Sequence, residues 1–142
     1  LVGIQAHVLQ RLGSRHVMVV YGLEGLDEIS LSGPTLVGEL KDDKISEYHI
    51  APQDFGLKTQ DLSAIKVDGV EQSKAMVLSA LANEAGAARD IVALNAGAGI
   101  YVAGLAPTLA GGVQKALAVI ASGAARKKLD AFVGFTQAAR DL

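Results

Sequence analysis

The chain has 142 residues, of which 50% are hydrophobic and 20% charged, and its formal net charge is −2. This length predicts one domain with its own core, and the mildly acidic charge predicts no nucleic-acid partner and no membrane partner. The lack of cysteine excludes disulfides and thiolate metal sites. Without a signal-peptide pattern or a membrane-length apolar run, the sequence predicts a cytoplasmic protein.

The first part of the sequence predicts a helix followed by strands. Residues Ala6–Leu12 have helical spacing, and Gly13 is a suitable helix stop. The short apolar run His16–Val20 is typical of a strand that is buried on both faces, as in a parallel sheet. Residues Thr35–Leu40 and Ile45–Ile50 flank a polar turn, so we expect them to form a β-hairpin.

The second part of the sequence predicts only helices. Four segments carry apolar residues at helical spacing and are separated by glycine or proline. They are Val70–Ala82, Arg89–Leu105, Thr108–Ala121 and Ala124–Ala139. Thr108 is a candidate N-cap, since its hydroxyl can accept a backbone hydrogen bond. The whole pattern indicates an α/β fold, with a mostly parallel sheet, a β-hairpin and a helical C-terminal region.

Two adjacent carboxylates, Asp27 and Glu28, follow the first strand on a loop that contains Gly22 and Gly25. Ligands of open α/β sheets bind beyond the carboxyl ends of the strands. Two hard oxygen ligands at such a place suit Mg²⁺, which takes one or two carboxylates and completes its shell with water and phosphate oxygens. From the local sequence alone a solvated acidic turn is favoured, because acidic dipeptides are common in loops.

Other chemical motifs are weaker. The glycine-rich stretch Asn95–Gly104 has Val102 where a dinucleotide-binding fingerprint needs its last glycine, so small residues for tight helix packing are the favoured interpretation. His7, His16 and His49 stand alone and are predicted to be surface or packing residues. We assign no catalytic residue and no organic cofactor.

Two long segments resemble the anthranilate phosphoribosyltransferase family. Residues Val19–Leu57 read "VVYGLEGLDEISLSGPTLVGELKDDKISEYHIAPQDFGL", similar to the family patterns V-V-H-G-x-x-G-L-D-E-[IV]-S, T-x-V-x-E-L and P-x-D-F-G-L. Residues Arg89–Leu129 are similar to the pattern R-D-x-V-x-x-N-A-A-A-x-L-Y-V-A-G and the segment that follows it. The match is collinear over nearly the whole chain, and it makes a metal site at Asp27 and Glu28 the favoured interpretation.

The resemblance implies an enzyme of tryptophan biosynthesis that transfers the phosphoribosyl group of 5-phosphoribosyl diphosphate to anthranilate and releases pyrophosphate. Family members depend on Mg²⁺, are usually homodimeric, and combine a small helical domain with a larger α/β domain. The D-E pair, here Asp27 and Glu28, holds the magnesium against the diphosphate. Residues 1–142 correspond to the C-terminal part of the α/β domain that binds 5-phosphoribosyl diphosphate.

This sequence also departs from the family pattern. The family's N-terminal helical domain, its G-T-G-G-D loop and its K-H-G-N segment are absent from this chain, so we expect residues 1–142 alone to have no transferase activity. Tyr21 stands where the family often has histidine, and the helical stretch before the first strand is shorter than usual. Three alternatives stay open: a pyrimidine-nucleoside phosphorylase-like enzyme, a non-catalytic nucleic-acid-binding relative of the same fold, and a bare scaffold fragment.

Overall fold

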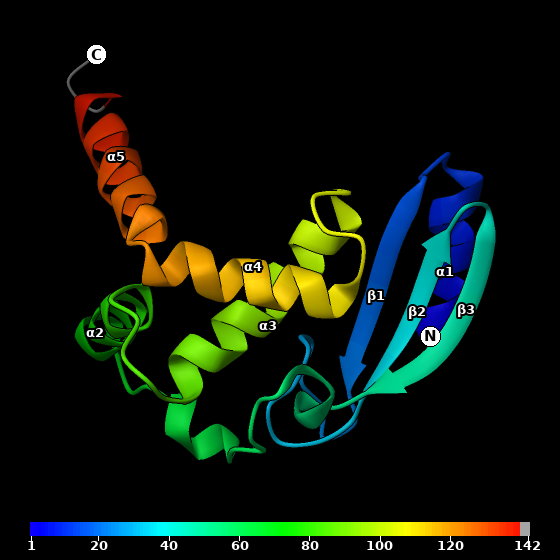
Figure 1. The fold of residues 1–142 in the computed structure, drawn as a ribbon, viewed down its shortest axis with the longest axis horizontal. Helices are drawn as coiled ribbons and strands as arrows, with labels where there is room; N and C mark the ends of the chain where they lie inside the picture. Colours follow the sequence, from blue (N-terminus) through cyan, green and yellow to red (C-terminus); the bar gives the residue numbers. More distant parts are fainter. Residues whose placement is uncertain (140–142) are drawn as a thin grey trace.

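The computed structural model describes residues 1–139, in which a three-stranded sheet is combined with five α-helices (Figure 1). The strands are β1 (His16–Gly22), β2 (Thr35–Lys41) and β3 (Lys44–Ile50). The helices are α1 (Val2–Arg11), α2 (Val70–Leu81), α3 (Ala87–Val102), α4 (Leu109–Ala121) and α5 (Ala124–Ala138), with short 3-10 helices η1 (Pro52–Phe55) and η2 (Leu62–Ile65). No helix within residues 1–139 is long and apolar enough to cross a membrane.

The predicted β-hairpin is confirmed as strands β2 and β3, which pair antiparallel with Lys41 opposite Lys44. The two turn residues, Asp42 and Asp43, have φ angles of 49° and 62°. Positive φ at both central residues is the signature of a type I′ turn, whose twist matches that of the flanking strands. Aspartate tolerates this conformation better than most residues, which explains why the polar turn closes the hairpin.

The expectation of a mostly parallel sheet is wrong for the described residues. Strand β1 pairs with β2 antiparallel, with His16 opposite Lys41 and Gly22 opposite Thr35, and the strand order is β1-β2-β3. The chain returns from β1 to β2 through residues 23–34, which contain no crossover helix, and a parallel pairing needs such a crossover. Strand β1 is also only half-buried rather than buried on both faces, because it lies at the edge of this sheet.

The four predicted C-terminal helices are confirmed, with ends that differ by a few residues. Thr108 caps α4, since its Oγ1 accepts a 3.0 Å hydrogen bond from the backbone N–H of Gly111. Gly13 follows the first helix with a φ of +84°, which a residue with a side chain rarely adopts. The sequence did not predict η2, and it placed the start of α1 at Ala6 rather than at Val2.

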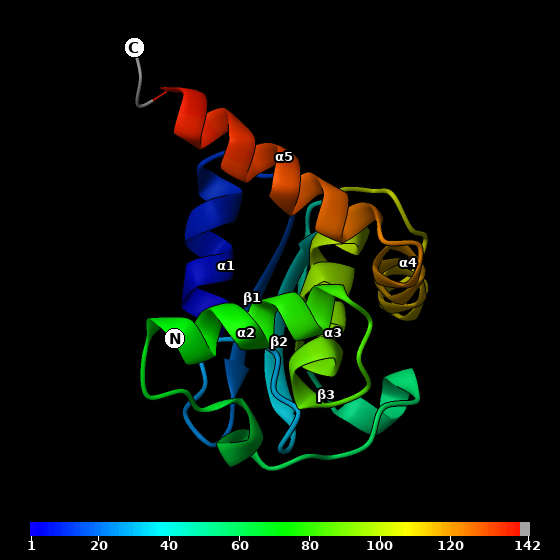
Figure 2. The same cartoon turned by 90° about the vertical axis from the view of Figure 1, so that its left-hand side faces the viewer.

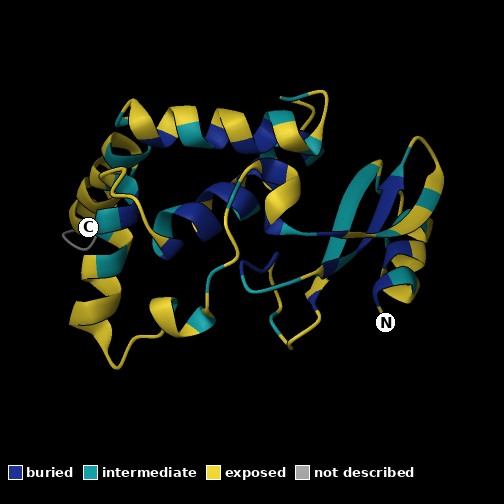
Figure 3. Ribbon diagram, turned by 60° about the horizontal axis from the view of Figure 1, so that its bottom comes forward, coloured by how far each residue is buried: buried dark blue, intermediate teal, exposed yellow. Residues whose placement is uncertain are grey.

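The sheet lies between α1 on one face and α3 on the other (Figure 2). Helix α1 approaches closely because β2 has Gly38 at the contact, where an added Cβ would lie 2.7 Å from Cγ1 of Val2. On the opposite face, Val37 of β2 and Ile50 of β3 belong to the same core cluster as Leu94 of α3. Helix α3 is therefore the central helix of the fold, and Figure 3 shows it largely buried while α5 is exposed.

Helices α3 and α4 are packed backbone to backbone at two glycines. A β-carbon added at Gly97 of α3 would lie 2.6 Å from the Cα of Val113. One added at Gly112 of α4 would clash with the carbonyl of Gly97 and lie 3.4 Å from the Cβ of Tyr101. This contact confirms close helix packing for Gly97 within Asn95–Gly104, whereas an added Cβ at Gly99 would have no heavy atom within 4 Å.

A buried carboxylate, Glu39, joins the sheet to the end of α3. Glu39 Oε1 lies 2.9 Å from Nε2 of His16, and Glu39 Oε2 accepts a 2.7 Å hydrogen bond from the hydroxyl of Tyr48. The ring of Tyr101 in α3 stands edge-on to His16, with 4.8 Å between centroids, and Lys41 Nζ donates to its hydroxyl. His16 is thus a packing residue, as the sequence predicts.

Replacing Glu39 with glutamine is expected to destabilise the chain mainly above pH 4. Burial acts to raise the pKa of Glu39, but hydrogen bonds from Tyr48, Tyr101 and His16 outweigh burial and hold the pKa below its ordinary value. A lowered folded-state pKa gives stability that is present above the unfolded pKa and is lost as the pH falls through the folded value.

Urea unfolding of the wild type and Glu39→Gln between pH 7 and pH 3 tests this prediction. We expect a loss of about 1.5–3 kcal/mol at pH 7, the usual contribution of hydrogen bonds to a charged group, and a smaller difference in acid. A difference in unfolding free energy that stays constant over this pH range would contradict the assigned role of the charge.

Candidate functional site

The loop that follows β1, residues 23–34, begins with a tight turn that depends on two glycines. The backbone N–H of Gly22 donates to the carbonyl of Leu26, and that of Gly25 donates to the carbonyl of Gly22, both at 2.8 Å. Gly25 has a φ of +106°, and an added Cβ at Gly22 would lie 3.1 Å from the Cβ of Leu26. The glycines therefore let the chain reverse directly at the end of β1, and this brings Asp27 and Glu28 to that end.

The second half of this loop is fastened to the core. Ile29 and Leu31 have only 2% and 1% of their surface exposed, and both belong to the core cluster that contains α3 residues. Ser30 between them is fully buried, and its N–H donates a 3.0 Å hydrogen bond to Oγ1 of Thr35. The two acidic residues thus stand immediately before a well-anchored segment, although both are exposed themselves.

Glu24 ties the two halves of the loop together. Its Oε1 accepts hydrogen bonds from the hydroxyls of Ser30 and Ser32, the latter at 2.7 Å. Burial acts to raise the pKa of Glu24, but these hydrogen bonds outweigh it and place the pKa below the ordinary glutamate value. Glu24 is therefore ionised at neutral pH and hydrogen-bonded within the loop, and Asp27 and Glu28 are the two exposed carboxylates that follow it.

Asn95, from the middle of α3, holds the backbone next to Glu28. Its Oδ1 accepts a 2.9 Å hydrogen bond from the N–H of Ile29, and its Nδ2 donates to the carbonyl of Ile29 at 3.0 Å. The same Nδ2 lies 3.1 Å from the carbonyl of Ile91, one turn earlier in α3. These contacts join residues 66 positions apart in the sequence.

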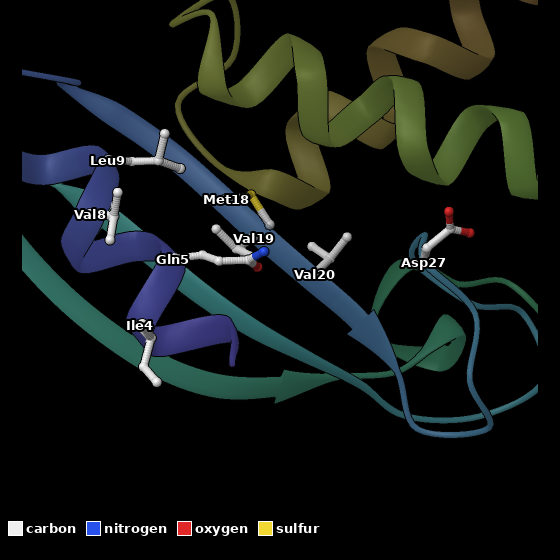
Figure 4. A pocket seen from close by; sticks show the side chains of 8 residues that line it. All are labelled: Ile4, Gln5, Val8, Leu9, Met18, Val19, Val20 and Asp27. Carbon is white, nitrogen blue, oxygen red and sulfur yellow. The ribbon is translucent and has the colours of Figure 1, made fainter. Parts of the chain in front are cut away.

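Asp27 lines an open cavity of about 550 Å³, together with side chains of α1 and β1 that are all apolar except Gln5. Figure 4 shows the Asp27 carboxylate apart from the other lining side chains, on the loop that follows β1. The other lining residues are Ile4, Gln5, Val8, Leu9, Met18, Val19 and Val20. The cavity follows the edge of β1 that has no neighbouring strand within residues 1–139.

The donor set fits part of a magnesium shell. Asp27 and Glu28 offer adjacent, exposed oxygen ligands, whereas no group of three or more His, Cys, Asp or Glu that could hold a metal is found in the described part of the chain. Mg²⁺ is commonly held by one or two carboxylates, while water and substrate phosphates complete its octahedral shell. The arrangement is therefore suited to a metal shared with a phosphorylated ligand and unsuited to a closed, all-protein metal site.

The family model for the glycosyl transferase family, a/b domain, matches residues 1–126. The chain belongs to this family. Among curated relatives, the glycosyl transferase chain is 62% identical over 137 residues to the anthranilate phosphoribosyltransferase of Polynucleobacter asymbioticus and 54% identical to that of Burkholderia ambifaria. Each alignment covers 96% of this chain, which spans 40% of the length of these relatives.

Solved structures have the same fold. The anthranilate phosphoribosyltransferase of Thermus thermophilus matches with a TM-score of 0.87 and 39% identity, over 96% of this glycosyl transferase chain and 40% of that one. The Saccharomyces cerevisiae enzyme, solved in complex with PRPP and Mg, matches with a TM-score of 0.72 and 24% identity, over 84% of this chain and 34% of that one. The yeast likeness establishes a common fold.

Proposed function

We propose that this chain is the metal-bearing part of an anthranilate phosphoribosyltransferase, which joins anthranilate to the ribose C1 of 5-phosphoribosyl diphosphate and releases pyrophosphate in tryptophan biosynthesis. The observation that carries the proposal is the 62% identity to an enzyme of that name over 96% of this chain. It is supported by the anchored loop after β1, on which the two carboxylates are exposed.

Asp27 and Glu28 act by binding a divalent cation and orienting it toward the diphosphate. Cleavage of the C1–O bond would leave negative charge on the departing pyrophosphate. Asp27 and Glu28 would hold a divalent cation there, and that cation would supply charge stabilisation without a proton donor. The carboxylates need no general-base role for this, and their exposure leaves room for a ligand on the solvent side. The anchoring at Ile29 limits the positions that the two side chains can take.

The complete enzyme would supply what residues 1–142 lack. We infer that these residues form the C-terminal part of the domain that binds 5-phosphoribosyl diphosphate, and that a parallel strand from another part of the protein pairs with the open edge of β1. The half-buried Met18 and Val20 on β1 and the exposed Ile4 and Val8 on α1 are suited to such a covering. The glycine-rich loop, most of the acceptor site and the surface for a homodimer would also lie outside this chain, in a cytoplasmic enzyme.

The activity is tested with the full-length protein that contains this sequence, incubated with anthranilate, 5-phosphoribosyl diphosphate and Mg²⁺. We expect anthranilate fluorescence to fall with time and pyrophosphate to appear in equal amount. Residues 1–142 alone should give no turnover. Phosphorolysis of a pyrimidine nucleoside without anthranilate consumption would instead support the phosphorylase-like alternative, and neither activity in a folded full-length protein would contradict the proposal.

A further inference from the structure

Asn95 makes a contact that its helix does not require. An asparagine in the interior of a helix is a poor helix former, and the neighbouring positions of α3 carry small or apolar side chains. Its amide forms a matched pair of hydrogen bonds with one residue of a distant loop, since Oδ1 accepts from the N–H of Ile29 and Nδ2 donates to the carbonyl of Ile29. We propose that Asn95 is a positioning residue that holds the Glu28 carboxylate in place for a divalent cation.

The contact of Asn95 reaches Glu28 through the backbone. The N–H of Ile29 belongs to the peptide unit that begins at the Cα of Glu28, and a peptide unit is planar. A hydrogen bond of 2.9 Å to this N–H therefore restrains the position of the Glu28 Cα, from which the side chain departs. The second bond, to the carbonyl of Ile29, prevents that segment from rotating about the first.

The amide itself is held in one orientation. Nδ2 faces two carbonyl oxygens, those of Ile29 and Ile91, while Oδ1 faces an N–H. A flipped amide would place an oxygen against two acceptors and an NH₂ group against a donor, so only one orientation satisfies all three contacts. Ile91 lies one turn away in the buried helix α3. The Asn95 amide therefore holds the loop in a defined position relative to the central helix of the fold.

Groups that orient metal ligands change metal affinity when they are removed, commonly by 10- to 100-fold. The proposal rests on the proposed metal site at Asp27 and Glu28, and it adds a residue that touches neither metal nor substrate. A merely structural Asn95 would change unfolding when replaced and leave cation affinity as it was. These two roles can therefore be separated by measuring both quantities.

The experiment uses the full-length protein with Asn95→Leu, which keeps the approximate volume but neither hydrogen bond, and Asn95→Ala, which admits water. Each protein is titrated with Mn²⁺ in place of Mg²⁺, and the free ion is measured by electron paramagnetic resonance. The apparent KM for Mg²⁺ and the kcat are measured in parallel by enzyme assay. We expect Mn²⁺ to bind roughly tenfold more weakly in both variants, with a similar rise in the KM for Mg²⁺. Thr108→Ala is the control, since it removes the N-cap of α4 without touching the loop and should leave Mn²⁺ affinity unchanged.

The outcomes separate this proposal from the proposed function. If the wild type binds Mn²⁺ and Glu28→Ala weakens that binding, but both Asn95 variants bind as the wild type does, only the positioning role is overturned. If Glu28→Ala binds Mn²⁺ as tightly as the wild type, the metal site itself is overturned and the positioning role with it. If neither Asn95 variant folds, Asn95 serves the fold alone and the proposal is also overturned.

Discussion

Glu28→Ala in the full-length protein is expected to lower kcat/KM for 5-phosphoribosyl diphosphate by at least roughly 30- to 150-fold. This loss corresponds to about 2–3 kcal/mol of transition-state stabilisation. Glu28 is exposed on the loop that follows β1, so its removal should leave the core intact. The expected loss arises because one of two oxygen ligands for the cation is gone, and the remaining carboxylate of Asp27 binds it more weakly. Initial rates over a magnesium titration measure this effect.

The magnesium titration distinguishes this role from a general loss of stability. We expect the Mg²⁺ concentration at half-maximal rate to rise in Glu28→Ala, and high Mg²⁺ to restore part of the activity. Glu71→Ala, which removes an exposed carboxylate from the first turn of α2, is the matched control and should behave as the wild type. An unchanged magnesium dependence in Glu28→Ala would exclude Glu28 as a ligand.

Gly112→Ala is expected to destabilise the chain by about 2–3 kcal/mol, the upper range for adding a methyl group to a well-packed core. The new Cβ would clash with the carbonyl of Gly97, which belongs to the backbone of α3 and cannot rotate away. Relief requires α4 to move off α3, and this opens the contact around Val113, which is fully buried. Urea unfolding followed by circular dichroism gives the free energy of unfolding.

Gly99→Ala is the matched control for this packing prediction. Gly99 lies two residues after Gly97 in the same helix, is exposed, and has no heavy atom within 4 Å of an added Cβ. Since alanine is the better helix former, Gly99→Ala should be neutral or stabilising by up to about 1 kcal/mol. Equal unfolding free energies for the Gly112 and Gly99 variants would contradict the inferred backbone contact between α3 and α4.

Local patterns in the sequence were sufficient for most elements of the fold. Helical spacing identified the four C-terminal helices, the Thr108 cap depends on a residue three positions away, and the hairpin follows from two strands that flank a polar turn. The pairing of β1 was predicted wrongly, because an apolar run records how much a strand is buried in the complete fold and carries no information on the direction of its neighbour. The apolar character of β1 fits the further neighbouring strand that we propose for the complete enzyme.

The sequence predicted only those parts of the candidate site that depend on residues close together along the chain. Asp27 and Glu28 could be placed at the end of a strand because an apolar run and two glycines precede them, and their metal role stays a prediction. The supporting contacts of Glu24 and Asn95 were not foreseen. For Asn95 the reason is distance along the chain, since 66 positions separate it from Ile29 and only the packing of α3 brings them together. A polar residue inside a helix of small and apolar residues was the one available signal.

A crystal structure of the full-length protein with Mg²⁺ and 5-phosphoribosyl diphosphate would show whether Asp27 and Glu28 hold the cation against the diphosphate. We predict a magnesium ion whose shell contains a carboxylate oxygen of Asp27 or Glu28 at about 2.0–2.1 Å together with diphosphate oxygens. Magnesium bound to the diphosphate with both carboxylates turned to solvent, or a diphosphate bound away from the end of β1, would contradict the account.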